Sequence, residues 1–157
     1  MKTTFLKHKI LSIVLLLILS VSFHGCSDDN DEAISFLENH ADSKWKFSEL
    51  GGTLYVKINN SQTNPFEIWI SFLESGCFIH ESINDDGTPE ILENTKNKLV
   101  VEIVDNPEEY TIITFTVTGD TLTVLSEYFE DGVLEEEEIF ILTKTSDNLN
   151  DLEICAF

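Results

Sequence analysis

Two pairs of glycine and aspartate divide the stretch from Tyr110 to Thr143 into three runs that are rich in β-branched and aromatic residues. Gly119-Asp120 and Asp131-Gly132 supply the positive φ angles that two-residue hairpin turns require, so this stretch predicts a three-stranded antiparallel meander. One face of the meander is apolar and the other is largely polar, and a sheet of this kind must bury its apolar face. The facing pairs on the apolar side are Val117 and Leu122, Phe115 and Val124, and Ile113 and Ser126.

The face that the last strand presents depends on the length of its turn. A two-residue turn at Asp131-Gly132 places Ile139 and Ile141 on the interior face. A three-residue turn places Phe140 and Leu142 there instead, because a slip of one residue exchanges the two faces of a strand. The sequence leaves both registers open.

Further strands are predicted upstream by alternating apolar residues, of which Phe66 to Phe72 is the clearest run. The segment from Glu90 to Asn97 stays open between a short edge strand and a loop. In total we expect an all-β fold, an antiparallel up-and-down meander of seven to eight strands in a barrel or half-barrel. A short helix within Glu32 to Ala41 precedes it. The other predicted strands are Lys44 to Phe47, Thr53 to Asn59, Cys77 to Ile83 and Lys98 to Val104.

The N-terminus has the pattern of an export signal. A basic region with Lys2, Lys7 and Lys9 precedes a nearly continuous apolar run from Ile10 to Phe23. This run is shorter than the roughly 20 residues of a membrane span and matches the apolar region of a signal peptide. It ends in Phe23-His24-Gly25-Cys26, which resembles the lipobox of bacterial lipoproteins. The resemblance implies a signal peptide over residues 1–25 and lipidation of Cys26, the alternative being an ordinary signal peptide with an incidental cysteine.

Residues 26–32 read Cys-Ser-Asp-Asp-Asn-Asp-Glu and are expected to form an acidic tether behind the lipid. In some Gram-negative lipoproteins such a stretch directs the protein to the outer face of the outer membrane. The resemblance therefore implies a cell-envelope protein that is lipid-anchored to the outer membrane without spanning it, with surface exposure. The chain has 29 acidic and nine basic residues, and every basic residue is a lysine. This balance disfavours nucleic acid as a partner.

After the tether, we expect one β-domain over residues 33–145 and a C-terminal tail over residues 146–157. With Cys26 assigned to the lipid, Cys77 and Cys155 remain as an even pair in an oxidising compartment. This favours a disulfide that fixes the tail to the sheet, with two free buried cysteines as the alternative.

The sequence contains no recognisable catalytic motif. His40 and His80 belong to no triad or metal-ligand pair, so we expect neither an enzyme nor a bound metal or cofactor. Asp85-Asp86-Gly87 is interpreted as a turn rather than a calcium loop, which requires acidic residues at alternating positions. The row from Glu135 to Glu138 is interpreted as a solvated strand end that discourages aggregation, with a cation-binding ring as the alternative.

Taken together, the lipoprotein signal, the short helix, the early Trp45 and the meander with Gly119 to Val124 resemble the small lipocalin-like domains of bacterial lipoproteins. The resemblance covers Ile34 to Lys144. The Gly-x-Trp element of lipocalins appears here as Ser43-Lys44-Trp45, and the chain has no arginine to stack on the tryptophan as in the larger family. The resemblance implies that Trp45 closes one end of a barrel and that a ligand binds at the other.

We therefore expect an envelope lipoprotein whose β-domain binds a small apolar molecule or an envelope partner. The alternative is an accessory surface lipoprotein that docks another protein and has no ligand pocket. Because phenylalanine is frequent in the inward rows, we expect a small or partly filled pocket. The candidate ligand-lining residues are Phe66, Ile68, Ile70, Phe72, Phe115 and Val124.

Overall fold

The computed structural model describes residues 34–49, 52–72, 76–83 and 88–156. The predicted signal peptide, the lipidation site Cys26, the acidic tether and the turn at Asp85-Asp86-Gly87 lie outside the described residues. Among the described residues, no helix has the length and apolar character needed to cross a membrane.

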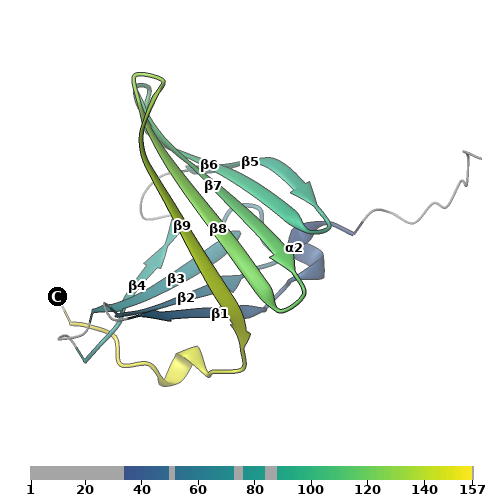
Figure 1. The fold of residues 1–157 in the computed structure, drawn as a ribbon, viewed down its shortest axis with the longest axis vertical. Coiled ribbons are helices and arrows are strands. Elements are labelled where there is room, and N and C mark those ends of the chain that lie inside the picture. The colour runs from purple at the N-terminus through teal and green to yellow at the C-terminus, as the bar shows by residue number, and fades with distance from the viewer. Residues whose placement is uncertain (1–33, 50–51, 73–75, 84–87, 157) are drawn as a thin grey trace, which may run out of the picture. The chain divides into compact units, whose positions relative to one another are not determined.

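The described chain forms one antiparallel sheet of nine strands in the order β4-β3-β2-β1-β9-β8-β7-β6-β5 (Figure 1). Two up-and-down meanders, β1 to β4 and β5 to β9, are joined into this sheet because β1 pairs with β9. No pairing between the edge strands β4 and β5 is present in the described part of the chain. The strands are β1 Lys44–Glu49, β2 Gly52–Ile58, β3 Phe66–Phe72, β4 Ile79–Ser82, β5 Thr88–Thr95, β6 Lys98–Asn106, β7 Glu109–Thr118, β8 Thr121–Glu130 and β9 Val133–Thr145.

The predicted antiparallel meander is confirmed, but the predicted number of strands, seven to eight, is wrong. The segment that the sequence left open between strand and loop forms β5, which pairs with β6 along its length. Pro89 is the second residue of this strand. Proline is tolerated there because β5 is an edge strand and a missing backbone donor can face away from the ladder.

The first hairpin turn of the predicted meander has the expected geometry. Gly119 has a φ angle of 60°, and the pairs Val117 with Leu122 and Phe115 with Val124 are those expected from the sequence. The apolar members of these pairs are buried, so the apolar face of the meander is the interior face.

A β-bulge decides which face of β9 points inward. Asp131 and Gly132 have φ angles of 52° and 74° and form a two-residue turn, with Glu130 paired to Val133. The register then shifts, because Phe129 pairs with Leu134 whereas Tyr128 pairs with Glu136, which leaves Glu135 as the extra residue. One extra residue exchanges the faces of the strand beyond it. The structure thus combines the two-residue turn with the interior face of Phe140 and Leu142, and Ile139 and Ile141 point outward.

The helix α2 (Phe36–Asn39) packs at one end of the sheet, beside β5 and β6 (Figure 1). Ser35 and Glu38 form a capping box at its start, which satisfies backbone donors of the first turn. Phe36 and Leu37 are buried, and the Leu37 N–H donates to Asn94 Oδ1 at 3.3 Å. The helix is shorter than the predicted segment.

Ile34 belongs to the segment predicted as helical, but it lies before the helix and is 51% exposed. The buried face of the helix therefore consists of Phe36 and Leu37 alone.

The closed end of the interior is built by side chains that are almost completely removed from solvent. They belong to the same hydrophobic cluster as the two buried helix residues. Burial of each large side chain contributes about 1.5 to 3 kcal/mol, so this end is the main source of stability. Its residues are Phe36, Leu37, Trp45, Ile58, Leu99, Leu122 and Leu142.

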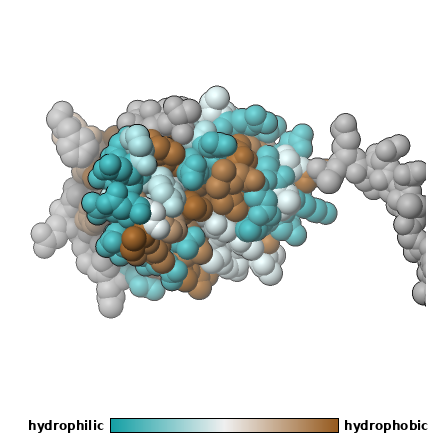
Figure 2. Space-filling view, turned by 90° about the horizontal axis from the view of Figure 1, so that it is seen from above, coloured by the Kyte–Doolittle hydropathy of each residue, from teal (hydrophilic) through white to brown (hydrophobic). Residues whose placement is uncertain are grey.

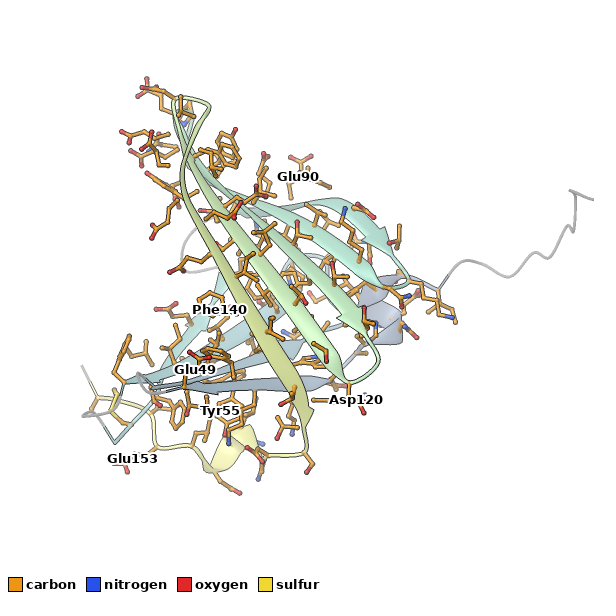
Figure 3. All side chains as sticks on the ribbon, in the orientation of Figure 1. Glu49, Tyr55, Glu90, Asp120, Phe140 and Glu153 are labelled. Atoms are coloured by element: carbon orange, nitrogen blue, oxygen red, sulfur yellow. A yellow bond between two sulfur atoms is a disulfide. The ribbon has the colours of Figure 1, made fainter. Side chains whose placement is uncertain are left out.

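The C-terminal segment covers part of the opposite, outer face of the sheet. Leu149, in the short 3-10 helix Leu149–Asp151, packs with Tyr55 and Trp69 in a second hydrophobic cluster. Tyr55 points from β2 toward this segment (Figure 3). Because Trp69 alternates with the inward residues of β3, the segment hides an aromatic face that would otherwise be exposed.

The predicted disulfide between Cys77 and Cys155 is present, with the two Cα atoms 5.1 Å apart. Backbone hydrogen bonds support it on both sides, from the Phe78 N–H to the Glu153 carbonyl at 2.7 Å and from the Cys155 N–H to the Phe78 carbonyl at 2.9 Å. The disulfide and this short bridge fix the tail to the segment that leads into β4.

A polar contact holds the beginning of the same segment. Asp147 Oδ2 accepts hydrogen bonds from the Tyr55 hydroxyl at 2.8 Å and from Lys46 Nζ at 3.1 Å. These two donors, Tyr55 first and Lys46 second, lower the pKa of Asp147 from its ordinary value. The tail is therefore attached to the sheet by an ion pair at one end and a disulfide at the other.

Exposed apolar side chains are interspersed with polar ones on the surface seen in Figure 2. Exposed apolar side chains are common on protein surfaces. The large apolar side chains with the greatest exposure are Phe72, Ile139, Ile141 and Val133.

Candidate ligand-binding cavity

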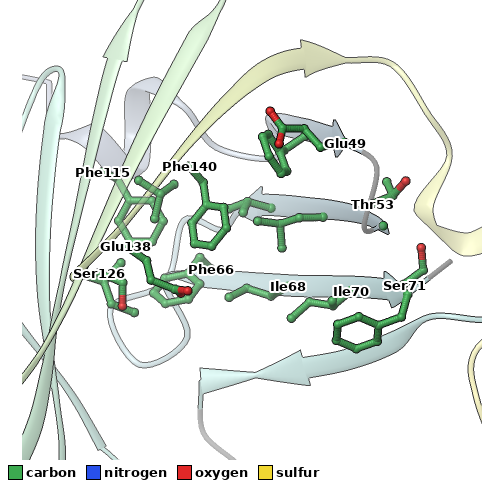
Figure 4. A pocket seen from close by; sticks show the side chains of 17 residues that line it. Glu49, Thr53, Phe66, Ile68, Ile70, Ser71, Phe115, Ser126, Glu138 and Phe140 are labelled. Carbon is green, nitrogen blue, oxygen red and sulfur yellow. The ribbon is translucent and has the colours of Figure 1, made fainter. Parts of the chain in front are cut away.

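A cavity of about 600 Å³ lies between the two halves of the sheet (Figure 4). Sites for small molecules in proteins typically measure about 300 to 1,000 Å³. The lining comes from β1, β2, β3, β7, β8 and β9, and most of it is apolar. The lining residues are Phe47, Glu49, Gly52, Thr53, Leu54, Val56, Phe66, Ile68, Ile70, Ser71, Phe72, Ile113, Phe115, Val124, Ser126, Glu138 and Phe140.

The alternation of the strands explains why these side chains gather. On β3, Phe66, Ile68, Ile70 and Phe72 follow one another at intervals of two residues, so all four face the cavity. Trp69, between them, faces the outer cluster. The inner row is apolar throughout its length, which makes β3 the longest apolar wall of the cavity.

Each half of the sheet contributes to both ends of the interior. On β1, Trp45 belongs to the closed end and Phe47 to the cavity. On β9, Leu142 belongs to the closed end and Phe140 to the cavity. The cavity therefore lies at the end of the interior opposite to α2, and Phe72, 60% exposed, stands at its mouth.

Two pairs of aromatic rings define the cavity. The rings of Phe66 and Phe115 lie with their centroids 4.7 Å apart, although four strands separate β3 from β7 in the sheet. This contact spans the interior and forms a floor between the cavity and the closed end. The rings of Phe47 and Phe140, 5.9 Å apart and nearly perpendicular, belong to the adjacent strands β1 and β9 and form part of a wall.

A few polar side chains lie among the apolar ones. Ser126 contributes a hydroxyl group, and Glu49 and Glu138 contribute carboxylates. Figure 4 shows Glu138 reaching toward the row on β3, with Glu49 on the β1 side of the same space. No lysine or histidine lines the cavity in the described part of the chain.

Gly52 fixes the backbone at the mouth. Its φ angle is 154°, and a Cβ atom built at this position would clash with the carbonyl oxygen of Ser71. Gly52 pairs with Phe72 across the ladder. Only glycine therefore allows β2 to approach β3 this closely at the edge of the cavity.

All six residues that the sequence indicated as candidates for ligand lining line this cavity. Their role in binding stays a prediction. The cavity is larger than the small or partly filled pocket that we expected from the phenylalanine content, because Phe66 and Phe115 contact each other as a floor instead of filling the mouth.

Sequence reasoning did not name Phe47, Phe140, Glu49 and Glu138 as lining residues. The alternation from Trp45 through Phe47 to Glu49 was a usable signal for β1. No comparable signal existed on β9, because the bulge at Glu135 determines which residues of that strand face inward.

The other polar cluster of interest lies on the outer face. His80 Nε2 is 3.2 Å from Glu67 Oε2, and the His80 ring stacks on Trp69 with the centroids 4.4 Å apart. Both polar groups are partly exposed and face away from the cavity. Among the described residues, no group of three or more histidine, cysteine, aspartate or glutamate side chains is arranged to hold a metal ion.

No known protein family, characterised protein or solved structure matches this chain. The geometry of the cavity is therefore the main guide to function.

Proposed function

We propose that this protein is a cell-envelope lipoprotein whose β-domain binds a small, mainly apolar molecule. The observation that carries the proposal is the cavity of about 600 Å³ with its predominantly apolar lining. A ligand that buries ten methylene groups would gain about 8 kcal/mol at ~0.8 kcal/mol each. A binding free energy of this size corresponds to a micromolar dissociation constant, before the entropic cost of immobilising the ligand is subtracted. Because that cost weakens binding further, a ligand needs to occupy most of the cavity.

The arrangement at the closed end supports a lipocalin-like half-barrel. Trp45 is 1% exposed, and its indole N–H donates to the Ser43 hydroxyl at 3.0 Å. Lys144 Nζ lies 5.7 Å from the centroid of the Trp45 ring. In this proposal the lysine takes the place of the arginine that stacks on the tryptophan in larger lipocalins, since a cation near an indole ring is favourable in either case.

The envelope location rests on the sequence. The basic start, the apolar run and Gly25-Cys26 favour export and lipidation, and the acidic residues 26–32 favour the outer membrane with surface exposure. The disulfide agrees with an oxidising compartment, where disulfides persist.

A second candidate function is docking of an envelope protein on the outer face of the sheet. Ile139 and Ile141 favour it, because their side chains are 59% and 60% exposed on neighbouring outward positions of β9. Leu125 pairs with Ile139 and extends this apolar area onto β8. A docking protein of this kind would not need the cavity.

Native mass spectrometry with fatty acids, fatty amines, haem and hydrophobic dyes tests the binding function. A protein that starts at Ser27 is suitable, because both hydrophobic clusters lie between Phe36 and Leu152. Ile70→Trp should weaken binding at least tenfold by occupying the cavity. The matched control Ile139→Trp introduces the same side chain on the outer face and should leave binding unchanged. Absence of binding by every compound would remove the ligand-carrier function and leave docking.

A further inference from the structure

Both charged side chains that line the cavity are carboxylates, those of Glu49 and Glu138. All six lysines of the described chain lie elsewhere. Lys46, Lys57 and Lys98 form ion pairs with carboxylates away from the cavity, and Lys144 lies over Trp45 at the closed end. An anionic group inside the cavity would therefore find no cation to pair with.

Each carboxylate lies two residues from one ring of the aromatic pair on the adjacent strands β1 and β9. Glu49 is two residues beyond Phe47 on β1, and Glu138 is two residues before Phe140 on β9. Since side chains two residues apart share a face of a strand, each carboxylate stands beside one ring of the aromatic pair. The bulge at Glu135 brings this about, because it turns Glu138 and not Glu137 toward the interior.

Neither Glu49 nor Glu138 has a side-chain hydrogen bond or an ion pair with any described residue. In contrast, Glu38, Glu67, Glu93 and Asp147 each have such partners. Carboxylates attract an ammonium group, and the faces of phenylalanine rings add a cation–π contribution. The mouth of the cavity thus joins an apolar volume to two carboxylates and two rings.

We propose that the cavity selects apolar molecules that carry an amine or another cationic group at one end, and that it disfavours fatty acids. This inference rests on the proposed ligand-binding function and specifies the class of ligand. The apolar part would lie along the β3 row above the floor formed by Phe66 and Phe115. The cationic end would lie between Glu49 and Glu138, beside Phe47 and Phe140.

Three ligands with the same twelve-carbon chain test the inference, namely dodecylamine, dodecanol and dodecanoic acid. Each is titrated below its micelle concentration at pH 7.5 into the protein starting at Ser27, and binding is measured by isothermal calorimetry. We expect dodecylamine to bind at least tenfold more tightly than dodecanoic acid, with dodecanol between them.

Variants then locate the source of the preference. Glu49→Gln combined with Glu138→Gln should weaken dodecylamine binding about tenfold and leave dodecanol binding within twofold. The matched control is Glu137→Gln combined with Glu127→Gln, which removes the same charge from a pair on the outer face. This control should leave the preference for the amine intact.

The outcomes separate the two proposals. If dodecanol binds but the amine and the acid bind equally, or if the control variant lowers amine binding as much as the cavity variant, the selection for cations is wrong and the ligand-binding function stands. If none of the three compounds binds, both proposals are wrong.

Discussion

Removal of the disulfide between Cys77 and Cys155 tests how far the tail stabilises the domain. The two cysteines are 78 residues apart in the sequence. In the chain-entropy description, closing a loop of this length lowers the entropy of the unfolded chain by an amount equivalent to about 4.5 kcal/mol at 25 °C. Native disulfides of small domains typically contribute about 2 to 5 kcal/mol, so the reduced protein should be less stable by at least 2 kcal/mol.

When the disulfide is reduced, the loss of structure should begin in the second hydrophobic cluster, which contains Tyr55, Trp69 and Leu149. Trp69 is 7% exposed beneath Leu149, whereas Trp45 is 1% exposed in the closed end. Release of the tail should expose Trp69 to solvent while Trp45 stays buried. A Trp69→Phe variant assigns the change in tryptophan fluorescence. It should lose the shift to longer wavelength that accompanies release of the tail, and it should retain the shift that accompanies exposure of Trp45.

Urea unfolding of the oxidised and reduced protein gives the measurement. With a slope of about 2 kcal/mol per M, a loss of about 2 to 4.5 kcal/mol lowers the midpoint by about 1 to 2 M. The matched control is Cys77→Ala combined with Cys155→Ala, whose midpoint should not respond to the reductant. Equal midpoints for the oxidised and reduced wild-type protein, or two free thiols in the purified protein, would refute the reasoning.

Three further predictions concern other parts of the chain. Asp147→Asn should lower the stability of the protein at neutral pH and have a smaller effect in acid. The pKa of the Asp147 carboxyl is lowered in the folded state. The stabilisation by this carboxylate is therefore present above the ordinary carboxyl pKa of about 3.9, and it is lost as the pH falls through the lowered pKa of the folded state. Thermal unfolding from pH 7 downward checks this, and a constant difference from the wild type would contradict it. Deletion of Glu135 should destabilise the fold by about 3 kcal/mol or more, because it turns Phe140 and Leu142 outward; a deletion variant with wild-type urea unfolding would show that the bulge does not set the register. Cys26→Ser should abolish membrane association in cell fractionation, and mass spectrometry of the mature N-terminus should find lipid on the wild-type cysteine.

Local pattern was sufficient where turns and alternation determine structure. Gly119-Asp120 predicted a hairpin with its pairs, and the alternation of Phe66 to Phe72 predicted the apolar wall of the cavity. The disulfide followed from the count of cysteines once Cys26 was set aside. For the hairpin and the wall, a few neighbouring residues carry the signal, whereas the disulfide was inferred from the number of cysteines in the whole chain.

The sequence pattern did not predict features that depend on contacts between distant residues or on a choice among identical ones. Glu135 to Glu138 are four identical residues, so nothing in them indicates which one forms the bulge or which face the strand presents. The contact between Phe66 and Phe115 brings β3 against β7, and no local sequence encodes it. The size of the cavity depends on this contact, and for this reason the sequence led us to expect a smaller pocket.

The position of α2 makes the two ends of the described domain unlike each other. The described chain enters at Ile34, next to the closed end, while the cavity opens at the other end of the same sheet. Side chains around the opening can therefore differ without changing the buried residues of the closed end, because the two sets share few positions.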